Sequence, residues 1–214
     1  WNDGTEQEVF TRDELIEKFS LKRVQKSGAR FDEKRLLWLN GAHIRNIPVD
    51  KLYEYVSPQD DNPQKDGGQT GFWPESAYTP NITKEYRMKV LALAQDRLKM
   101  FEDLRGFGYF FAEPEINMEL IDGNKQLKKL SDSERRELLE TARAELAKLA
   151  DWTPESIQNC LNELLETTGQ KPGILFSLIR IAVTWAPFSP QLNDTLALIG
   201  KEKTLQRLNI YLDN

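Results

Sequence analysis

The sequence predicts an all-α protein with about nine or ten helices. Apolar residues recur at intervals of three and four along most of the chain, which is the period of a helix with one buried face. Capping motifs precede several of these stretches, and the alternating pattern of a strand is hard to find. The chain has 214 residues, 39% hydrophobic and 29% charged, which is enough to bury a core in one or two domains.

A capping box opens the first helix. The Thr11 hydroxyl can accept a hydrogen bond from the amide three residues on, and the Glu14 carboxylate can accept one from the amide of Thr11. The apolar side of this short helix then consists of Leu15, Ile16 and Phe19. Gly28 is expected to mark a turn after it.

A second helix is expected after Asp32, a residue type that favours the N-cap position. We expect it to end near Asn40 and Gly41, with Asn40 as a capping residue, because glycine is common where a helix stops. Residues 46–48 break the pattern, and residues 49–56 predict another short helix. Three apolar residues around the second helix are interpreted as core: Phe31, Leu36 and Trp38.

Residues 57–81 contain four prolines and three glycines and lack an apolar period. This composition predicts a long loop, which we expect to be the most mobile or variable part of the chain. The strongest helical pattern follows, from Thr83 to about Leu104. Gly106 and Gly108 are expected to stop this helix.

The rest of the chain predicts a run of helices with clear start signals. Ser131 with Glu134 forms a capping box, and Thr153 precedes Pro154 at a first helical position, where no amide donor is needed. The expected helices cover residues 117–130, 131–149, 153–165, 174–185, 191–199 and 201–212.

Charge is unevenly distributed. The net charge of −5 argues mildly against a nucleic-acid partner, because phosphate binding needs local positive potential. Between Lys18 and Arg45, however, eight basic residues stand against only two acidic ones. Residues 119–166 are acidic instead. One face is therefore expected to be basic, with an ordinary solvated surface as the simpler interpretation.

Residue types needed for catalysis are scarce. His43 is the only histidine and Cys160 the only cysteine, so a histidine-based metal site, a catalytic triad and an internal disulfide have almost nothing to build on. Phosphate-binding loops, dinucleotide-binding glycine turns and runs of eighteen apolar residues do not occur in the sequence. The residues by themselves indicate a non-catalytic helical binding module.

Motifs of one family occur in order along the chain. The most specific is Phe-Asp-Glu-Lys-Arg-Leu-Leu-Trp-Leu-Asn at residues 31–40, followed by Ile44 and Arg45. Trp-Thr-Pro-Glu at 152–155 and Arg-Ile-Ala-Val-Thr at 180–184 come later. The chain thereby resembles the C-terminal half of bacterial-type glutamyl-tRNA synthetases, and the two active-site signatures of that family are absent from it.

The resemblance implies three helical parts. Residues 1–47 would be the tail of a stem-contact region. Residues 48–118, which include the long loop, would form a first anticodon-binding subdomain. Residues 119–214 would form a second one.

The resemblance also implies which residues recognise tRNA. The expected anticodon-binding residues are Arg97, Arg180, Ser189, Pro190 and Leu192. Two further arginines, Arg35 and Arg45, are candidates for contacts with phosphates on the inside of the tRNA, which would position it without reading its sequence. Simpler interpretations stay open: Arg97 as a surface residue, and Arg180 as a member of an internal salt bridge.

Trp185 departs from the family pattern, which usually has glycine there. We expect its ring either to crowd the anticodon pocket or to supply a stacking surface. His43 also replaces a commonly aromatic residue and is interpreted as structural.

The parent protein implied is a glutamate–tRNA ligase, a class I aminoacyl-tRNA synthetase of the cytoplasm. It would activate glutamate with ATP and charge tRNA-Glu. ATP and magnesium would lie in an absent catalytic domain, so this chain is expected to hold no cofactor or metal and to be inactive alone. Its expected partner is tRNA-Glu, without DNA or membrane, and it is expected to be a monomer. The alternative is a helical protein–protein interaction module that does not bind RNA.

Overall fold

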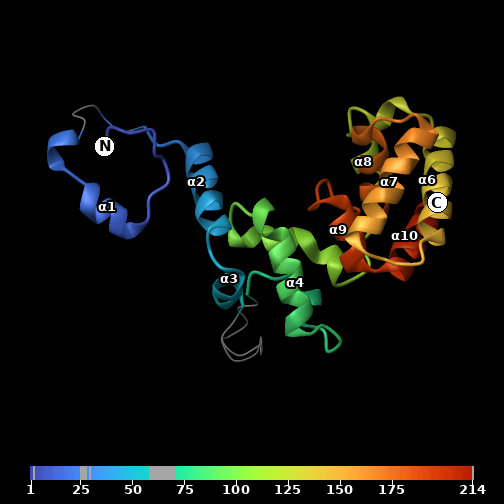
Figure 1. Ribbon diagram of the computed structural model, residues 1–214, viewed down its shortest axis with the longest axis horizontal. Helices are drawn as coiled ribbons and strands as arrows, with labels where there is room; N and C mark the ends of the chain where they lie inside the picture. The colour runs from blue at the N-terminus through green and yellow to red at the C-terminus, as the bar shows by residue number, and fades with distance from the viewer. Residues whose placement is uncertain (2, 25–27, 29, 58–70, 214) are drawn as a thin grey trace.

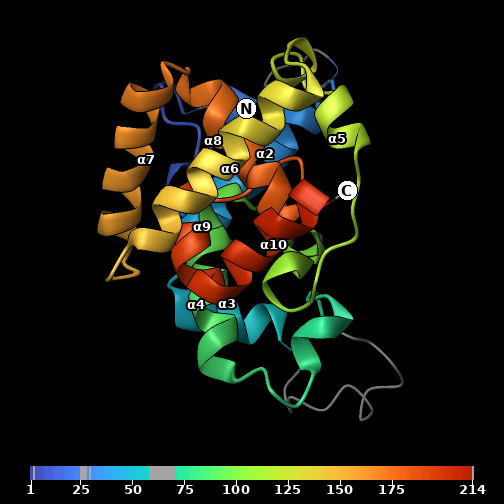
Figure 2. The ribbon, with the colours of Figure 1, turned by 90° about the vertical axis from the view of Figure 1, so that its right-hand side faces the viewer.

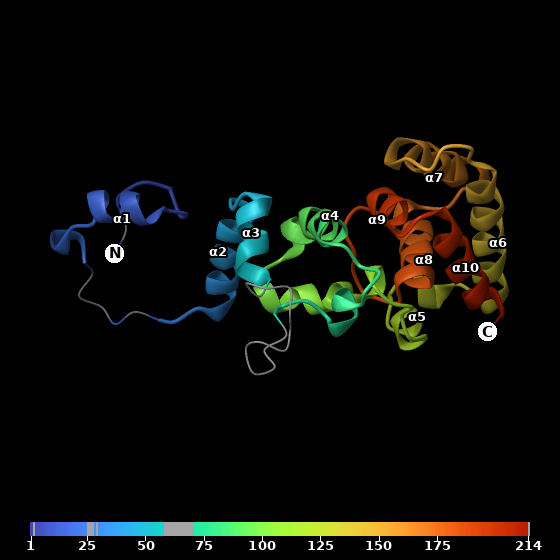
Figure 3. The ribbon, with the colours of Figure 1, turned by 90° about the horizontal axis from the view of Figure 1, so that it is seen from below.

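The structure, a computed structural model, describes residues 1, 3–24, 28, 30–57 and 71–213. Every regular element in these ranges is helical, with ten α-helices and five 3-10 helices, so the predicted all-α class is confirmed. The elements form an arch (Figure 1). Helix α1 lies at one end, α2 to α4 lie in the middle, and α6 to α10 form a bundle at the other end (Figures 1 and 3). None of the described helices is long and apolar enough to cross a membrane.

The N-terminal end of the arch has little core of its own. Helix α1 (Arg12–Lys18) begins at the predicted capping box, where the Thr11 amide donates to the Glu14 carboxylate at 2.7 Å. It contains no buried residue, and η1 (Leu21–Arg23) follows it. The ring of Trp1 packs between Phe10 and Phe19, with centroid distances of 6.0 and 5.7 Å. This small aromatic cluster holds α1 in place. The predicted turn at Gly28 adjoins residues 25–27 and 29, which lie outside the described ranges.

Helix α2 (Glu33–Arg45) starts where the sequence predicts, because the Asp32 carboxylate accepts from the Arg35 amide at 3.1 Å. It does not end near Gly41, and that prediction is wrong. A Cβ at Gly41 would lie 3.0 Å from the carbonyl oxygen of Leu98, so the glycine allows a close approach of two backbones. Asn40 is likewise no cap, since its Nδ2 donates to the carbonyl of Lys99 at 2.5 Å.

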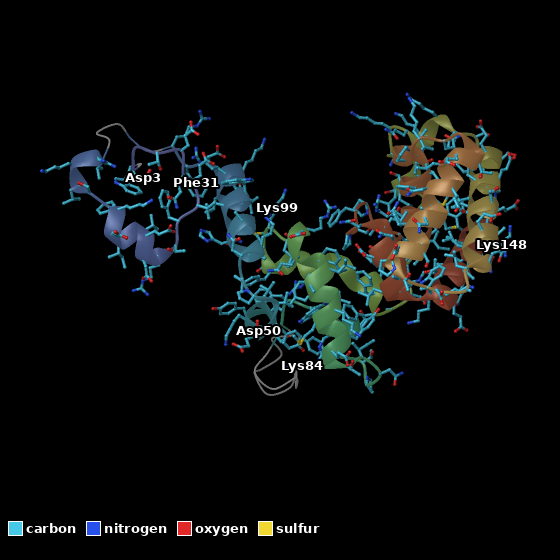
Figure 4. All side chains as sticks on the ribbon, viewed as in Figure 1. Asp3, Phe31, Asp50, Lys84, Lys99 and Lys148 are labelled. Atoms are coloured by element: carbon cyan, nitrogen blue, oxygen red, sulfur yellow. The ribbon has the colours of Figure 1, made fainter. Side chains whose placement is uncertain are left out.

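The three residues interpreted as core around α2 are exposed. Phe31, Leu36 and Trp38 are 78%, 50% and 46% exposed, so that prediction is wrong. Figure 4 shows Phe31 beside the start of α2, away from the C-terminal bundle. The helix instead buries its last turns, through Ala42 and Ile44.

Helix α3 (Val49–Val56) has the predicted bounds, but the loop expected over 57–81 is only partly described. Residues 58–70 of it lie outside the described ranges. The remainder contributes two residues to the core, because Trp73 is 1% exposed and a 3-10 helix, η2 (Glu75–Tyr78), buries Ala77. The Trp73 indole donates to the Ser57 hydroxyl at 3.1 Å.

The helix expected from Thr83 to Leu104 is interrupted. Helix α4 (Lys84–Ala94) passes into η3 (Gln95–Arg97), and the longer η4 (Phe101–Phe110) follows after a break. The cause is local: Leu98 is extended, and the Asp103 carboxylate accepts from the amides of Lys99 and Met100 at 2.8 and 2.9 Å. These bonds start a new helix, which continues through Gly106 and Gly108 with a kink at Phe107.

The C-terminal bundle follows the predicted order of helices. Its capping signals at Ser131 and Thr153 are confirmed. The single helix predicted over 117–130 is wrong, because the Asn124 side chain accepts from two amides at 3.0 and 3.2 Å and divides it into short pieces. The observed elements are α5 (Glu119–Asp122), η5 (Leu127–Lys129), α6 (Asp132–Lys148), α7 (Pro154–Thr168), α8 (Pro172–Thr184), α9 (Leu192–Ile199) and α10 (Lys201–Asp213).

Polar bonds join the middle of the arch to the bundle, with α4 and α9 lying close together (Figure 2). The Tyr86 hydroxyl on α4 lies 3.1 Å from the carbonyl oxygen of Phe110 and 3.4 Å from that of Leu198 on α9. Arg207 of α10 is 2% exposed and donates to the carbonyls of Ala112 and Val183, each at 3.1 Å. The subdomain limits at residues 47 and 118 stay predictions from the sequence.

Candidate nucleic-acid interface

A pocket of about 460 Å³ lies where α4 and η3 meet the start of α9. Arg97, at the end of η3, is an exposed residue that lines this pocket, and Pro190 and Gln191, which precede α9, line it as well. The structure therefore brings together two of the residues expected to bind an anticodon. We call this the arginine pocket, lined by Ala92, Leu93, Asp96, Arg97, Pro190, Gln191 and Asp194.

Arg180 adjoins the arginine pocket through the α8–α9 connection. Its Nε donates to the Ser189 hydroxyl oxygen at 2.8 Å, and the Ser189 hydroxyl in turn donates to the Pro190 carbonyl at 2.9 Å. Within the described ranges Arg180 has no ion pair with a carboxylate, so the internal salt bridge considered above is not observed. Its other guanidinium nitrogens form no hydrogen bond with the described residues.

The two arginines interact electrostatically. Burial lowers the pKa of Arg180, and the positive charge of Arg97 lowers that pKa further, while the nearby Tyr109 hydroxyl acts in the opposite direction. Arg180 nevertheless stays protonated at neutral pH, because the pKa of an arginine starts from a very high value. Asp96 and Asp194 also line the arginine pocket but form no ion pair with either arginine among the described residues, so the region combines two positive and two negative charges.

Tyr109 completes the buried side of this region. It is 4% exposed, and its hydroxyl has no hydrogen-bond partner among the described residues. Burial raises the pKa of Tyr109 far above its ordinary value, so the hydroxyl stays neutral. It therefore places no negative charge beside Arg180.

Ser189 and Leu192 are structural parts of the site. Both are only 4% exposed, and Leu192 begins α9 with its side chain in the core. Their burial fixes the connection that carries Pro190 into the pocket.

Trp185 meets neither expectation stated for it. Its backbone is left-handed, with φ 45° and ψ 36°, at the C-terminal end of α8. The ring is 9% exposed and stacks on Tyr211 of α10, with centroids 5.7 Å apart and planes 17° apart. It packs into the bundle and does not line the arginine pocket.

The arginines expected to contact phosphates lie on and near α2. Arg35 is exposed and pairs with Glu8, which is also exposed, at 2.9 Å, a kind of surface bridge that contributes little to stability. Arg45 is exposed in the last turn of α2. That turn abuts η3, because the Gln95 side chain donates to the carbonyl of Ile44 at 2.8 Å. Figure 4 places Lys99 on the concave side of the arch between α2 and the bundle.

Other chemistry finds no support in the described part of the chain. It contains no group of three or more histidine, cysteine or acidic side chains that could hold a metal. Cys160 is buried, and burial raises the pKa of its thiol, which makes the reactive thiolate scarcer. The His43 side chain is exposed on α2.

Two residues near the site are not among those predicted from the sequence. Gln95 connects α2 to η3, and no local pattern marks a buried glutamine of this kind. Phe188, at the centre of the α8–α9 connection, did leave a signal. It stands between Pro187 and Ser189-Pro190, and an aromatic residue in such a connection is a common binding element.

Comparisons with known proteins show which proteins this chain is similar to. Residues 51–212 match the anticodon binding domain family. Glutamate–tRNA ligases from Chloroflexus aurantiacus and a Roseiflexus species are 32% and 35% identical over 209 residues, 97% of this chain. The chain spans about 40% of the length of these curated relatives. A crystal structure of a glutamate tRNA ligase from Elizabethkingia meningosepticum in complex with its amino acid shares the fold, with a TM-score of 0.69 and 22% identity over the whole chain and 39% of that protein.

Proposed function

Because the chain belongs to the anticodon binding domain family, we propose that it recognises the anticodon of tRNA-Glu as part of a glutamate–tRNA ligase. The observation that carries this proposal is the pair Arg97 and Arg180 at the arginine pocket. RNA sequence is read mostly at unpaired loop bases, which present their edges to hydrogen-bond donors and their faces to flat groups. A guanidinium offers both a fork of donors and a flat surface.

The parent protein in this proposal activates glutamate with ATP and transfers it to tRNA-Glu in the cytoplasm. ATP and magnesium would bind in the part of that protein that this chain does not span, and this chain would supply recognition as a monomer. The names of the relatives support glutamate as the amino acid. A protein–protein interaction module, the alternative from the sequence, is not favoured by a match to an RNA-recognition family.

Arg97 is proposed to read the third anticodon base. An arginine offers only donors, which suit the acceptors of cytosine, whereas a glutamine offers a donor and an acceptor. Arg97→Gln should therefore narrow the preference for cytosine over guanine by about 1–3 kcal/mol, mainly by weakening the cognate complex. The measurement is the affinity for two anticodon stem–loop hairpins that differ only in this base, repeated as aminoacylation of tRNA-Glu and tRNA-Gln by the full-length ligase. If Arg97→Gln leaves the ratio of the two affinities unchanged, Arg97 is an ordinary surface residue.

Arg35 is proposed to contact a phosphate. Arg35→Ala should weaken tRNA-Glu and tRNA-Gln about equally and reduce the slope of log affinity against log salt by about one unit. Both effects are measured by the affinity for the two tRNAs across a series of salt concentrations. Glu8→Gln is the matched control, because it removes the same surface bridge and leaves the arginine. If the control weakens binding as much as Arg35→Ala, the bridge matters and the phosphate contact does not exist.

A further inference from the structure

Phe188 is an exposed aromatic ring beside the arginine pocket. It is 49% exposed, and among the described residues from 119 onward it is the only large hydrophobic side chain that reaches the surface to this degree. Leaving so much apolar area in water costs free energy of about 25 cal/mol for each Å². The rest of the bundle avoids this cost, so the position needs an explanation.

The ring is held in place from one side. It meets Phe107 edge to face, with centroids 6.2 Å apart and planes 75° apart, and Phe107 is fully buried. Gly106 also borders the ring, since a Cβ there would lie at an ordinary contact distance of 3.9 Å from the ring tip of Phe188. An aromatic ring fixed at one edge, with much of its surface free, is a suitable stacking surface.

The ring belongs to the same connection as two residues of the site. Phe188 directly precedes Ser189, which accepts from Arg180, and Pro190, which lines the arginine pocket together with Arg97. One short connection therefore carries an exposed aromatic ring and part of the arginine pocket. Aromatic rings beside a positive groove are the common means of holding single-stranded nucleic acid.

We propose that Phe188 stacks on an unpaired base of the RNA that occupies the arginine pocket. This inference rests on the proposed function and adds a contact to it. Stacking is tolerant of sequence because every base has a flat face, so Phe188 contributes affinity, whereas Arg97 contributes discrimination. The two residues thus differ in which quantity they change.

The test compares Phe188→Leu with Phe188→Trp. Leucine keeps an apolar cover over Phe107 but has no ring, whereas tryptophan keeps a ring. The leucine variant should bind the tRNA-Glu anticodon stem–loop about 10-fold more weakly, within the range expected for one stacked base. Its affinity should fall by the same factor for hairpins with cytosine and for hairpins with guanine as the third anticodon base. The tryptophan variant should bind as tightly as the parent chain or tighter.

Fluorescence separates stacking from simple support. The probes are hairpins that each carry 2-aminopurine at a different anticodon position. The unsubstituted chain and the tryptophan variant should quench the fluorescence of the probe at one of these positions, and the leucine variant should not. Full affinity and full quenching with leucine would overturn the inference and leave the proposed function standing. Weaker binding with quenching retained and a lower melting temperature would make Phe188 a structural support, which also overturns it. If the parent chain binds none of the hairpins, the proposed function itself fails.

Discussion

Arg207→Met should lower the free energy of unfolding by about 1–3 kcal/mol, the range for leaving a buried hydrogen-bond acceptor without its donor. Arg207 is 2% exposed and donates to the carbonyls of Val183 and Ala112 and to the Glu113 carboxylate, the last at 3.0 Å. Methionine fills similar space but leaves the buried Val183 carbonyl without this donor, which costs free energy, whereas water can solvate the half-exposed Glu113 carboxylate. Urea unfolding followed by circular dichroism measures the change.

Lys203→Met is the control for this prediction, because it removes one positive charge from an exposed position on the same helix. It should change stability by less than about 0.5 kcal/mol. If both variants unfold at the same urea concentration, Arg207 does not secure α10 to α8 and to the segment after η4.

Arg180→Ala should weaken binding of the tRNA-Glu anticodon stem–loop about 100-fold, which corresponds to about 2.7 kcal/mol. The variant loses a half-buried guanidinium whose free donors face no carboxylate among the described residues. Because burial and Arg97 lower the pKa of Arg180, its charge is disfavoured in the folded chain. Removing it should leave the free energy of unfolding unchanged or increase it. Titration of the hairpin and urea unfolding measure the two quantities.

This prediction is specific, because the affinity for the hairpin should fall while the free energy of unfolding should not. Lys148→Ala changes the net charge by the same amount. Figure 4 places Lys148 on the C-terminal bundle, far from Lys99, which follows Arg97 of the arginine pocket by two residues. It should reduce hairpin binding less than 3-fold at 0.15 M salt, where distant surface charges are largely screened. An Arg180→Ala variant that is clearly less stable than the parent chain would show that Arg180 supports the fold, and its weaker binding would then say nothing about base contact.

The sequence predicted helix starts better than it predicted burial. Thr11 with Glu14 and Ser131 with Glu134 start helices because the bonds are made within one turn and need no other element. Trp38 was misjudged because apolar spacing shows that a helix has an apolar face but not whether anything covers it. Gly41 was misjudged because a glycine that ends a helix and one that lets two backbones approach are identical in sequence.

The candidate site shows the same limit of sequence patterns, which do not reveal how separate elements pack together. Periodicity places Arg97 and Pro190 on separate elements, and only the packing of α4 on α9 brings them to one pocket. Their selection came from the resemblance to a family, and their roles stay predictions. The break at Leu98 was missed because it depends on the Asp103 side chain capturing two amides, a bond that competes with the helix and has no periodic signature.

The left-handed backbone of Trp185 has a consequence for how this chain associates with a ligand. A glycine there would reach the same angles at no steric cost, but it would also sample many others. The tryptophan is confined by its stack on Tyr211, and it begins the connection that carries Phe188 and Ser189. That connection is therefore preorganised. The conformational entropy of ordering it is lost when the bundle folds, so less remains to be lost when a ligand arrives.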